Sequence, residues 1–170
     1  MAVEPRKQGV QGAKVALLVV LVVAWVVLDQ WSKTFFAGVE PGTSFGLVLG
    51  GLVNVFLVHN TGAAWGVFAG NPSALGVFSV AVVAIMLAFF FWKAREINVV
   101  QTVGIALIAA GGIGNAIDRF AQGYVTDFIA VTFMDFPVFN VADIGVTCGV
   151  VVLVIGFIIE SRNGAKDRAD

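Results

Sequence analysis

Four long apolar segments constrain most strongly what this chain can fold into. They cover about residues 14–36, 74–92, 99–117 and 139–159. A helix of 19 residues, such as 74–92, is about 28 Å long, close to the ~30 Å hydrocarbon core of a bilayer. Only 12% of the residues are charged, against roughly 25% in a typical soluble domain. The sequence therefore predicts an all-α polytopic membrane protein with four transmembrane helices.

The four segments are expected to form a single integral membrane domain over residues 1–170. The first segment could be mistaken for a secretory signal, but it continues into Asp29-Gln30-Trp31-Ser32-Lys33 and has no cleavage site of the Ala-x-Ala kind, so we expect a retained helix. The first connection, residues 37–73, is rich in glycine. Within it, Leu52–His59 is β-branched and aromatic, which predicts a strand in a small extracytoplasmic β-rich region.

The basic residues indicate the orientation of the helices. Eight of the ten Lys and Arg residues fall before the first segment, between the second and third, or after the fourth, and they are Arg6, Lys7, Lys14, Lys93, Arg95, Arg162, Lys166 and Arg168. Cytoplasmic loops carry the excess of Lys and Arg, so both termini are predicted to be cytoplasmic. The chain is therefore predicted to be a multi-pass membrane protein.

With this orientation, unusual polar residues from four separate parts of the chain meet near the opposite, extracytoplasmic face. Each is costly at a membrane margin and is a functional candidate. Two purely structural alternatives remain open: an interfacial ion pair of Asp29 with Lys33, and a surface ion pair of Asp118 with Arg119. The gathered residues are Asp29, Lys33, Asn60, Asn115, Asp118, Arg119, Asp127, Asn140 and Asp143.

Other residues are given structural roles. Gly104, Gly111, Gly112 and Gly114 predict close helix packing in the third span. The single cysteine, Cys148, is predicted to be a small buried hydrophobe. His59 is interpreted as a structural or interfacial histidine, because no Ser, Cys or metal-ligand group surrounds it. No basic cluster suggests nucleic acid as a partner.

The chemistry available to the polar cluster is that of carboxylates. The cluster has no cysteine thiol, histidine pair or phosphate-binding glycine loop. Two aspartates in a low dielectric cannot both ionise cheaply, so they tend to share one proton and provide a base and an acid together. Such a pair can hydrolyse a peptide bond by activating water, without a covalent intermediate.

Five short motifs resemble those of the lipoprotein signal peptidases, also called signal peptidase II. Each motif alone is weak, but five in order along four spans are specific, and the resemblance extends from Lys14 to Glu160. The motifs are Asp29-Gln30-x-Ser32-Lys33, Asn60-Thr61-Gly62-Ala63-Ala64, Gly114-Asn115-x-x-Asp118-Arg119, Val125-x-Asp127-Phe128 and Phe139-Asn140-x-Ala142-Asp143.

The resemblance implies an intramembrane aspartyl endopeptidase of the bacterial cytoplasmic (inner) membrane that removes the signal peptide from prolipoproteins, cutting before a diacylglyceryl-modified cysteine. It also implies that no metal or organic cofactor is needed. It implies Asp127 and Asp143 as the catalytic pair. The partners implied are these prolipoproteins, membrane lipid and globomycin-type inhibitors. The residues implied to bind substrate or support the pair are Asp29, Lys33, Asn60, Gly62, Asn115, Asp118, Arg119, Asn140 and Ala142.

Two other functional classes compete with this interpretation. A proton- or ion-coupled small membrane transporter also needs intramembrane carboxylates, although such proteins usually have internal repeats and a site near the bilayer midplane. A structural or assembly factor that packs through its glycine-rich helix is the second, and it would tolerate loss of the aspartates.

Overall fold

Four long helices and a small sheet make up the computed structural model, which describes residues 5–62 and 70–166. The helices are α1 (Pro5–Thr34), α2 (Pro72–Trp92), α3 (Val99–Ala121) and α4 (Val141–Lys166). All four are long and apolar enough to span a membrane, which confirms the predicted helical segments. Helix α1 begins nine residues before the predicted boundary at residue 14, so the helix includes the polar residues that precede the apolar segment.

Helix α3 is the centre of the bundle and packs against the three other helices. Its contact with α4 is close because glycines face each other: a Cβ on Gly104 would lie 2.6 Å from the backbone nitrogen of Leu153, and a Cβ on Gly149 would lie 2.8 Å from the Gly104 carbonyl oxygen. In lipid, small residues of this kind let helix backbones approach and gain dispersion contacts. The predicted role of the α3 glycines is therefore confirmed at Gly104.

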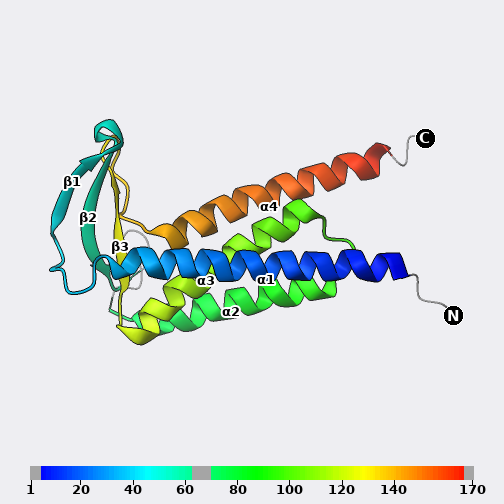
Figure 1. Ribbon diagram of the computed structural model, residues 1–170, viewed down its shortest axis with the longest axis horizontal. Helices are drawn as coiled ribbons and strands as arrows, with labels where there is room; N and C mark the ends of the chain where they lie inside the picture. Colours follow the sequence, from blue (N-terminus) through cyan, green and yellow to red (C-terminus); the bar gives the residue numbers. More distant parts are fainter. Residues whose placement is uncertain (1–4, 63–69, 167–170) are drawn as a thin grey trace.

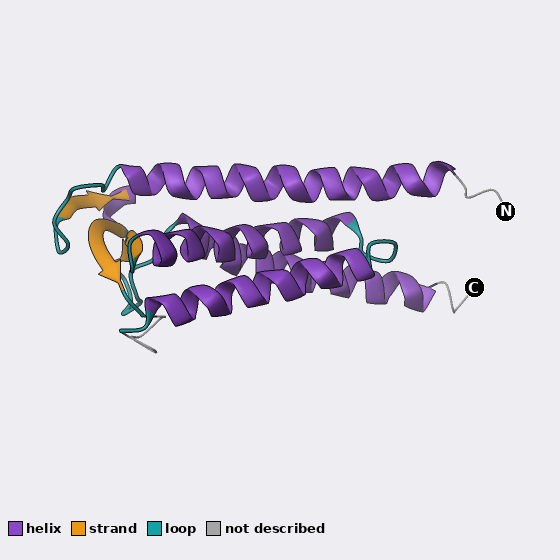
Figure 2. Cartoon of the chain, turned by 90° about the horizontal axis from the view of Figure 1, so that it is seen from below, coloured by secondary structure: helices purple, strands orange, loops and turns teal. Residues whose placement is uncertain are grey.

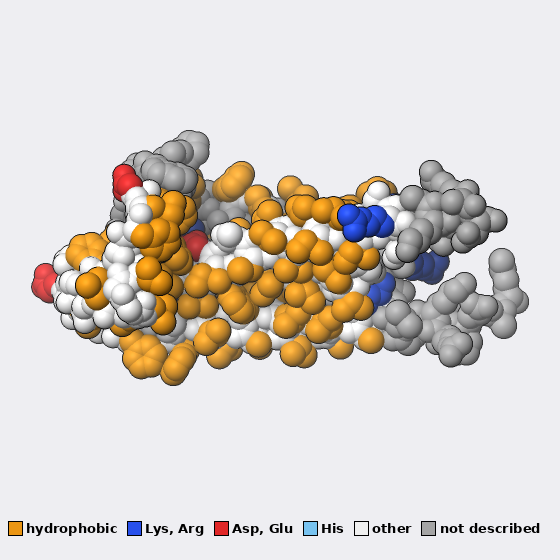
Figure 3. Space-filling view, turned by 90° about the horizontal axis from the view of Figure 1, so that it is seen from above, with side chains coloured by type: hydrophobic (Ala, Val, Ile, Leu, Met, Phe, Trp, Pro, Cys, Tyr) orange, Lys and Arg blue, Asp and Glu red, His pale blue; other side chains and the backbone are white. Residues whose placement is uncertain are grey.

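The face of the bundle seen in Figure 3 is apolar along its length, as expected for side chains that face lipid. Val20, Val23 and Val27 of α1 and Val77 and Phe78 of α2 are among the exposed large hydrophobic residues. In the same view, Lys and Arg side chains gather at the end of the bundle opposite the sheet.

The sheet lies across one end of the bundle, and the first residues of α1 and the last of α4 lie together at the other end (Figures 1 and 2). It contains β1 (Ser44–Val48), β2 (Val53–Asn60) and β3 (Val125–Val131), antiparallel in the order β1-β2-β3. A short 3-10 turn, Leu49–Gly51, joins β1 to β2, and Gly50 and Gly51 adopt positive φ angles of 68° and 90° there. Glycine reaches these angles without a Cβ clash.

Strand β2 confirms the strand predicted at Leu52–His59. Strand β3 was not predicted from the sequence, and Val125–Val131 pairs with β2. The residues after β3 then turn back, and Phe139 forms an isolated antiparallel bridge with Ile129. This return places the start of α4 beside β3.

Candidate active site

The first turn of α4 contains Asp143, and the local sequence fixes its position. Asn140 precedes the helix and accepts a hydrogen bond on its side chain from the Asp143 backbone N–H (3.0 Å), while the Asp143 carboxylate accepts one from the Asn140 backbone N–H (3.1 Å). This reciprocal pair is a capping box with aspartate in the position usually taken by glutamate. Asp143 is thereby held at the helix N-terminus, where an anion is stabilised by the helix dipole.

Asp127 lies in the middle of β3 and is brought to Asp143 by the bridge at Phe139. The Ile129 N–H donates to the Phe139 carbonyl oxygen (2.8 Å), so the next residue, Asn140, lies beside the strand. The Asn140 side-chain amide donates to Asp127 Oδ1 (2.6 Å). Asn60, at the end of the neighbouring strand β2, donates to Asp127 Oδ2 (2.9 Å).

Asn140 and Asn115 connect the two carboxylates through side chains that carry no charge. Asn115, from α3, donates to Asp143 Oδ1 (2.7 Å) and accepts from the Asn140 amide (3.0 Å). Each of the four carboxylate oxygens of Asp127 and Asp143 therefore accepts a hydrogen bond from a neutral donor. The two carboxyl groups are oriented without a cation in direct contact, so a proton can be kept within the pair.

The environment of Asp127 alters its protonation. Burial, followed by the negative charge of Asp143, raises the pKa of Asp127 to about 7, although the hydrogen bonds from Asn60 and Asn140 and the charge of Lys33 act in the opposite direction. Burial and a nearby like charge both disfavour the carboxylate. Near neutral pH the site is therefore able to hold a proton that an ordinary aspartate would have lost.

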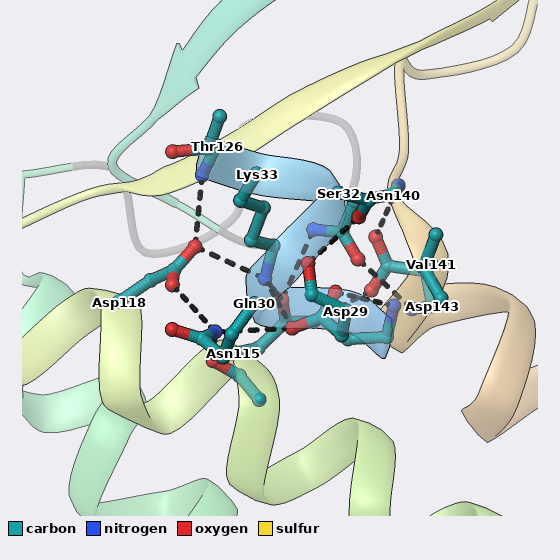
Figure 4. Close-up of polar contacts among 12 residues, drawn as sticks. Asp29, Gln30, Ser32, Lys33, Asn115, Asp118, Thr126, Asn140, Val141 and Asp143 are labelled. Atoms are coloured by element: carbon teal, nitrogen blue, oxygen red, sulfur yellow. Dashed lines mark hydrogen bonds and ion pairs between the residues drawn. The ribbon is translucent and has the colours of Figure 1, made fainter. Parts of the chain in front are cut away.

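Behind the two aspartates lies a second polar group, built around Lys33 (Figure 4). Lys33 Nζ contacts Asp29 Oδ2 at 2.8 Å and Asp118 Oδ2 at 3.0 Å. Asp29, Lys33 and Asp118 have exposed fractions of 0%, 7% and 2%. Both structural alternatives for these residues are therefore wrong. The Asp29–Lys33 ion pair forms, but it is buried rather than interfacial. Asp118 pairs with Lys33 rather than with Arg119.

Arg119, the residue after Asp118 on α3, has different partners. Its guanidinium donates to the Gly62 carbonyl oxygen (3.2 Å) and to the Asn115 carbonyl oxygen (3.4 Å). Its Nε is buried without a hydrogen-bond partner within the described part of the chain. The Gly62 N–H is held by the Asn60 side chain (2.9 Å), so the predicted Asn-Thr-Gly segment forms a turn next to Asp127. Ala63 and Ala64 of the same motif lie outside the described residues.

A cavity of about 750 Å³ opens in front of the two aspartates. Asp127, Asp143, Asn60, Asn115 and Arg119 line its polar part. The rest is mainly apolar and lies between α2, α4 and the segment that follows β3, with a lining that includes Leu75, Phe78, Val131, Met134, Phe139, Ile144 and Val146. The site therefore combines a carboxyl pair with a space suited to aliphatic groups.

The prediction that Cys148 is buried is wrong. Cys148 is exposed and lines this cavity, a little more than one turn of α4 beyond Asp143. The helix face that carries it looks toward the cavity instead of α3.

His59 stacks on Tyr124 with ring centroids 3.8 Å apart. Both rings line a second cavity of about 460 Å³, on the face of β3 away from Asp127. Residues 5–62 and 70–166 contain no group of three or more His, Cys, Asp or Glu placed to hold a metal ion.

Comparison with known proteins agrees with the motifs. The family described as Signal peptidase (SPase) II matches residues 21–159. The chain belongs to the signal peptidase II family. A lipoprotein signal peptidase of Staphylococcus aureus is 35% identical over 153 residues, 88% of this chain and 92% of that protein. The corresponding protein of S. aureus strain JH9 is 34% identical over 148 residues, 85% of this chain and 90% of its own length.

Solved structures give the same result for the fold. One, described as a bacterial membrane enzyme, has a TM-score of 0.77 and 32% identity, covering 87% of this chain and 91% of its own. A second with the same description has a TM-score of 0.73 and 32% identity, covering 84% and 92%. This signal peptidase II family member is thus a multi-pass bacterial membrane protein, and the resemblance inferred from its motifs is confirmed.

Most of the residues singled out by the motifs meet at the site. Gln30 was quoted only as part of a motif, and its amide donates to Asp29 Oδ2 (3.1 Å), Asp118 Oδ1 (3.0 Å) and the Gly114 carbonyl oxygen (3.2 Å). Trp25 was missed entirely, and its indole N–H donates to the Val141 carbonyl oxygen (3.0 Å). A tryptophan inside an apolar helix carries no signal in sequence that it holds the start of another helix.

Proposed function

We propose that this chain is an aspartyl endopeptidase that removes the signal peptide from prolipoproteins by cutting just before a diacylglyceryl-modified cysteine. The observation that carries the proposal is that Asp127 and Asp143 line one cavity and are joined by Asn140, in a chain of the signal peptidase II family. The relatives are named lipoprotein signal peptidases, and the same substrate class is proposed here.

In the proposed reaction the two carboxyl groups hold one proton between them. The ionised carboxylate takes a proton from a water molecule, which attacks the carbonyl carbon of the scissile peptide bond. The protonated carboxyl gives its proton to the developing oxyanion, which yields a tetrahedral gem-diol. The proton taken from water then goes to the leaving amine as the carbon–nitrogen bond breaks, and one hydroxyl proton of the gem-diol returns to the pair as the new carboxyl product forms. The raised pKa of Asp127 supports its holding the shared proton near neutral pH.

The residues around the pair divide into two groups. Asn60, Asn115 and Asn140 hold the carboxyl groups through the hydrogen bonds described above. Arg119 lines the cavity, and among the described residues its guanidinium donates only to carbonyl oxygens. We assign to it the binding of the substrate backbone. A planar guanidinium with five N–H donors is suited to peptide carbonyls.

The apolar part of the cavity supports a lipid-modified substrate. Leu75 and Phe78 from α2 face Ile144 and Val146 from α4 across it. An acyl chain in this part of the cavity stays in an apolar environment like that of the bilayer. Keeping it out of water is worth about 0.8 kcal/mol per CH₂. The proposal places the diacylglyceryl group in this part and the scissile bond at the aspartates.

The orientation proposed is that predicted from the basic residues, with both termini in the cytoplasm and the active site at the extracytoplasmic face of the inner membrane. It is supported by the Lys and Arg side chains at the end of the bundle away from the sheet. A small transporter is not favoured, since the family is that of a peptidase. In addition, Asp127 lies in β3 and Asp143 in the first turn of α4, and the sheet lies at one end of the bundle rather than midway along it (Figure 1).

The decisive experiment incubates purified protein with a diacylglyceryl-modified precursor and with its unlipidated twin. We expect cleavage of the lipidated precursor alone. Asp127→Asn and Asp143→Asn should each lower kcat by at least about 100-fold, the lower range for loss of general acid–base catalysis. Asp135→Asn is the matched control, because Asp135 is an exposed aspartate in the same region and does not line the cavity. Near-normal turnover by either catalytic variant would refute the carboxyl-pair mechanism.

We also propose that globomycin-type cyclic peptides inhibit the enzyme by occupying this cavity. Inhibition should be competitive with the lipidated precursor. A purely noncompetitive pattern would place the inhibitor elsewhere.

A further inference from the structure

We propose that Lys33 is a positioning residue that sets the separation of the two catalytic aspartates by linking the buried carboxylates Asp29 and Asp118. The inference rests on the proposed function, because it takes Asp127 and Asp143 as the reacting pair.

Each catalytic aspartate is preceded by a residue whose backbone N–H is held by a buried carboxylate. Asp29 Oδ1 accepts the hydrogen bond of the Ala142 N–H at 2.8 Å, one residue before Asp143. Asp118 Oδ2 accepts that of the Thr126 N–H at 3.1 Å, one residue before Asp127. Hydrogen bonds to an ionised acceptor are roughly twice as strong as neutral ones. The helix that carries one aspartate and the strand that carries the other are thus each fixed by a carboxylate.

Lys33 connects these two carboxylates to each other. Its ammonium group contacts Asp29 Oδ2 (2.8 Å) and Asp118 Oδ2 (3.0 Å), and it also donates to Asn115 Oδ1 (3.2 Å). Figure 4 shows Lys33 between Asp118 on one side and Asp29 on the other. Because Asn115 in turn donates to Asp143, all three contacts of Lys33 lead to the catalytic pair.

Lys33 has no hydrogen-bond donor left for the substrate. An ammonium group has three donors, and the three contacts above use them. The described residues that line the catalytic cavity do not include Lys33. It therefore acts through Asp29, Asp118 and Asn115 rather than on the reacting atoms, which separates it from Arg119, whose guanidinium lines the cavity.

A charged link suits this task better than an apolar one. The uncharged Gln30 amide already donates to the same two carboxylates at 3.1 Å and 3.0 Å. Helices α1 and α3 would therefore stay connected without Lys33. The lysine adds a cation between the two buried carboxylates and offsets their mutual repulsion. Without this cation Asp29 and Asp118 would move apart, and the Ala142 and Thr126 amides that they hold would move with them.

The test measures catalysis and the two backbone amides separately, in the full-length protein in detergent micelles. Lys33→Met should lower kcat for the lipidated precursor by about 100-fold, the cost associated with a misplacement near 1 Å, with KM unchanged. Amide hydrogen exchange, followed by NMR, should become faster at both Ala142 and Thr126. Lys93→Met is the matched control, since Lys93 forms an exposed pair with Glu96 outside the site, and it should change none of these quantities.

Two further variants keep the test decisive if Lys33→Met does not fold. Asp29→Asn should speed exchange at Ala142 with little change at Thr126, and Asp118→Asn should do the reverse. The triple change Asp29→Asn, Lys33→Met and Asp118→Asn removes the charges together and keeps two acceptors, so it should recover folding but not full kcat.

The inference is overturned if Lys33→Met folds and keeps wild-type kcat, or if neither asparagine variant alters its own amide. Recovery of full kcat in the triple variant would also overturn it. Failure of the proposed function is recognised separately, because it would appear as absence of cleavage by the wild-type protein. The exchange measurements would still decide whether Lys33 holds the two amides.

Discussion

Asn140 is the residue whose replacement by alanine most sharply tests how the site is assembled. Its side chain is fully buried and makes three hydrogen bonds: to Asp127 at 2.6 Å, to Asn115 at 3.0 Å and from the Asp143 N–H at 3.0 Å. It is both the cap of α4 and the link between the two carboxyl groups that we propose to be catalytic. Asn140→Ala removes all three bonds and changes no charge.

The cost to stability follows from these contacts. Loss of a helix cap costs about 1 kcal/mol. Each of the other two bonds contributes about 1 kcal/mol when both partners are considered, and more if the remaining partner cannot find water. We therefore expect Asn140→Ala to destabilise the protein by about 2–4 kcal/mol, which can be measured as the shift in thermal unfolding in micelles. Asn71→Ala removes only the cap of α2, through the bond to the Ala74 N–H, and should cost about 1 kcal/mol.

The effect on catalysis has two parts. Misplacement of Asp127 relative to Asp143 should lower kcat by about 100-fold. The pH profile should also move, because the Asn140 amide stabilises the Asp127 carboxylate and its loss raises the pKa of Asp127 above about 7. Activity that needs the shared proton falls as pH rises through this pKa, so the alkaline limb should shift to higher pH in the variant.

The assay is cleavage of the lipidated precursor from pH 5 to 9 at saturating substrate. An alkaline limb that stays in place, together with kcat within about threefold of wild type (well under the loss expected from misplacement), would refute the role of Asn140. Asn71→Ala should leave both the limb and kcat unchanged, so a general effect of lower stability can be separated from a local one.

Three further predictions test other parts of the molecule. Folding raises the pKa of Asp127 from 3.8 to about 7, so its contribution to stability is fully present below about pH 4 and lost as pH rises to about 7. The wild-type Tm should therefore fall between about pH 4 and 7 and level off above, and Asp127→Asn should remove most of that fall. Gly149→Ala places a Cβ 2.8 Å from backbone atoms of α3 and should lower the free energy of unfolding by about 1–3 kcal/mol. Gly12→Ala, with nothing within 4 Å of the added Cβ, should be neutral or slightly stabilising. Equal effects on stability would contradict the packing of α3 on α4. In a cysteine-free background, a membrane-impermeant thiol reagent should label Glu40→Cys in intact spheroplasts but not Asn163→Cys, and the reverse pattern would invert the proposed topology.

The helices were predictable because their signal is local. A run of about 20 apolar residues has few alternatives to a membrane helix, since lipid offers no partner for unpaired backbone groups. Strand β2 was predicted for a similar reason, from its β-branched and aromatic residues. Strand β3 was not, because Val125–Val131 contains the functional Asp127 and depends on pairing with β2, about 70 residues earlier in the chain.

The composition of the site was also predictable, since aspartates and asparagines at membrane margins are costly and few. Its connections were not. The sequence allowed Asp29 to pair with Lys33 at the interface and Asp118 with Arg119 at the surface, because both are neighbours on their helices. Packing of α1 against α3 instead buried Lys33 between Asp29 and Asp118. The exposure of Cys148 likewise depended on which face of α4 meets the cavity.

By itself, then, the sequence determined that the chain spans a membrane four times and carries a set of polar residues that lipid would otherwise exclude, because burial costs depend on residue type alone. Only the tertiary structure decided which of these residues bond to each other. The fold brings Asn140 between Asp127 and Asp143 through the Phe139–Ile129 bridge. A hydrogen bond requires positions within a few tenths of an ångström, and four segments distant in sequence acquire such positions only when the helices and the sheet pack together.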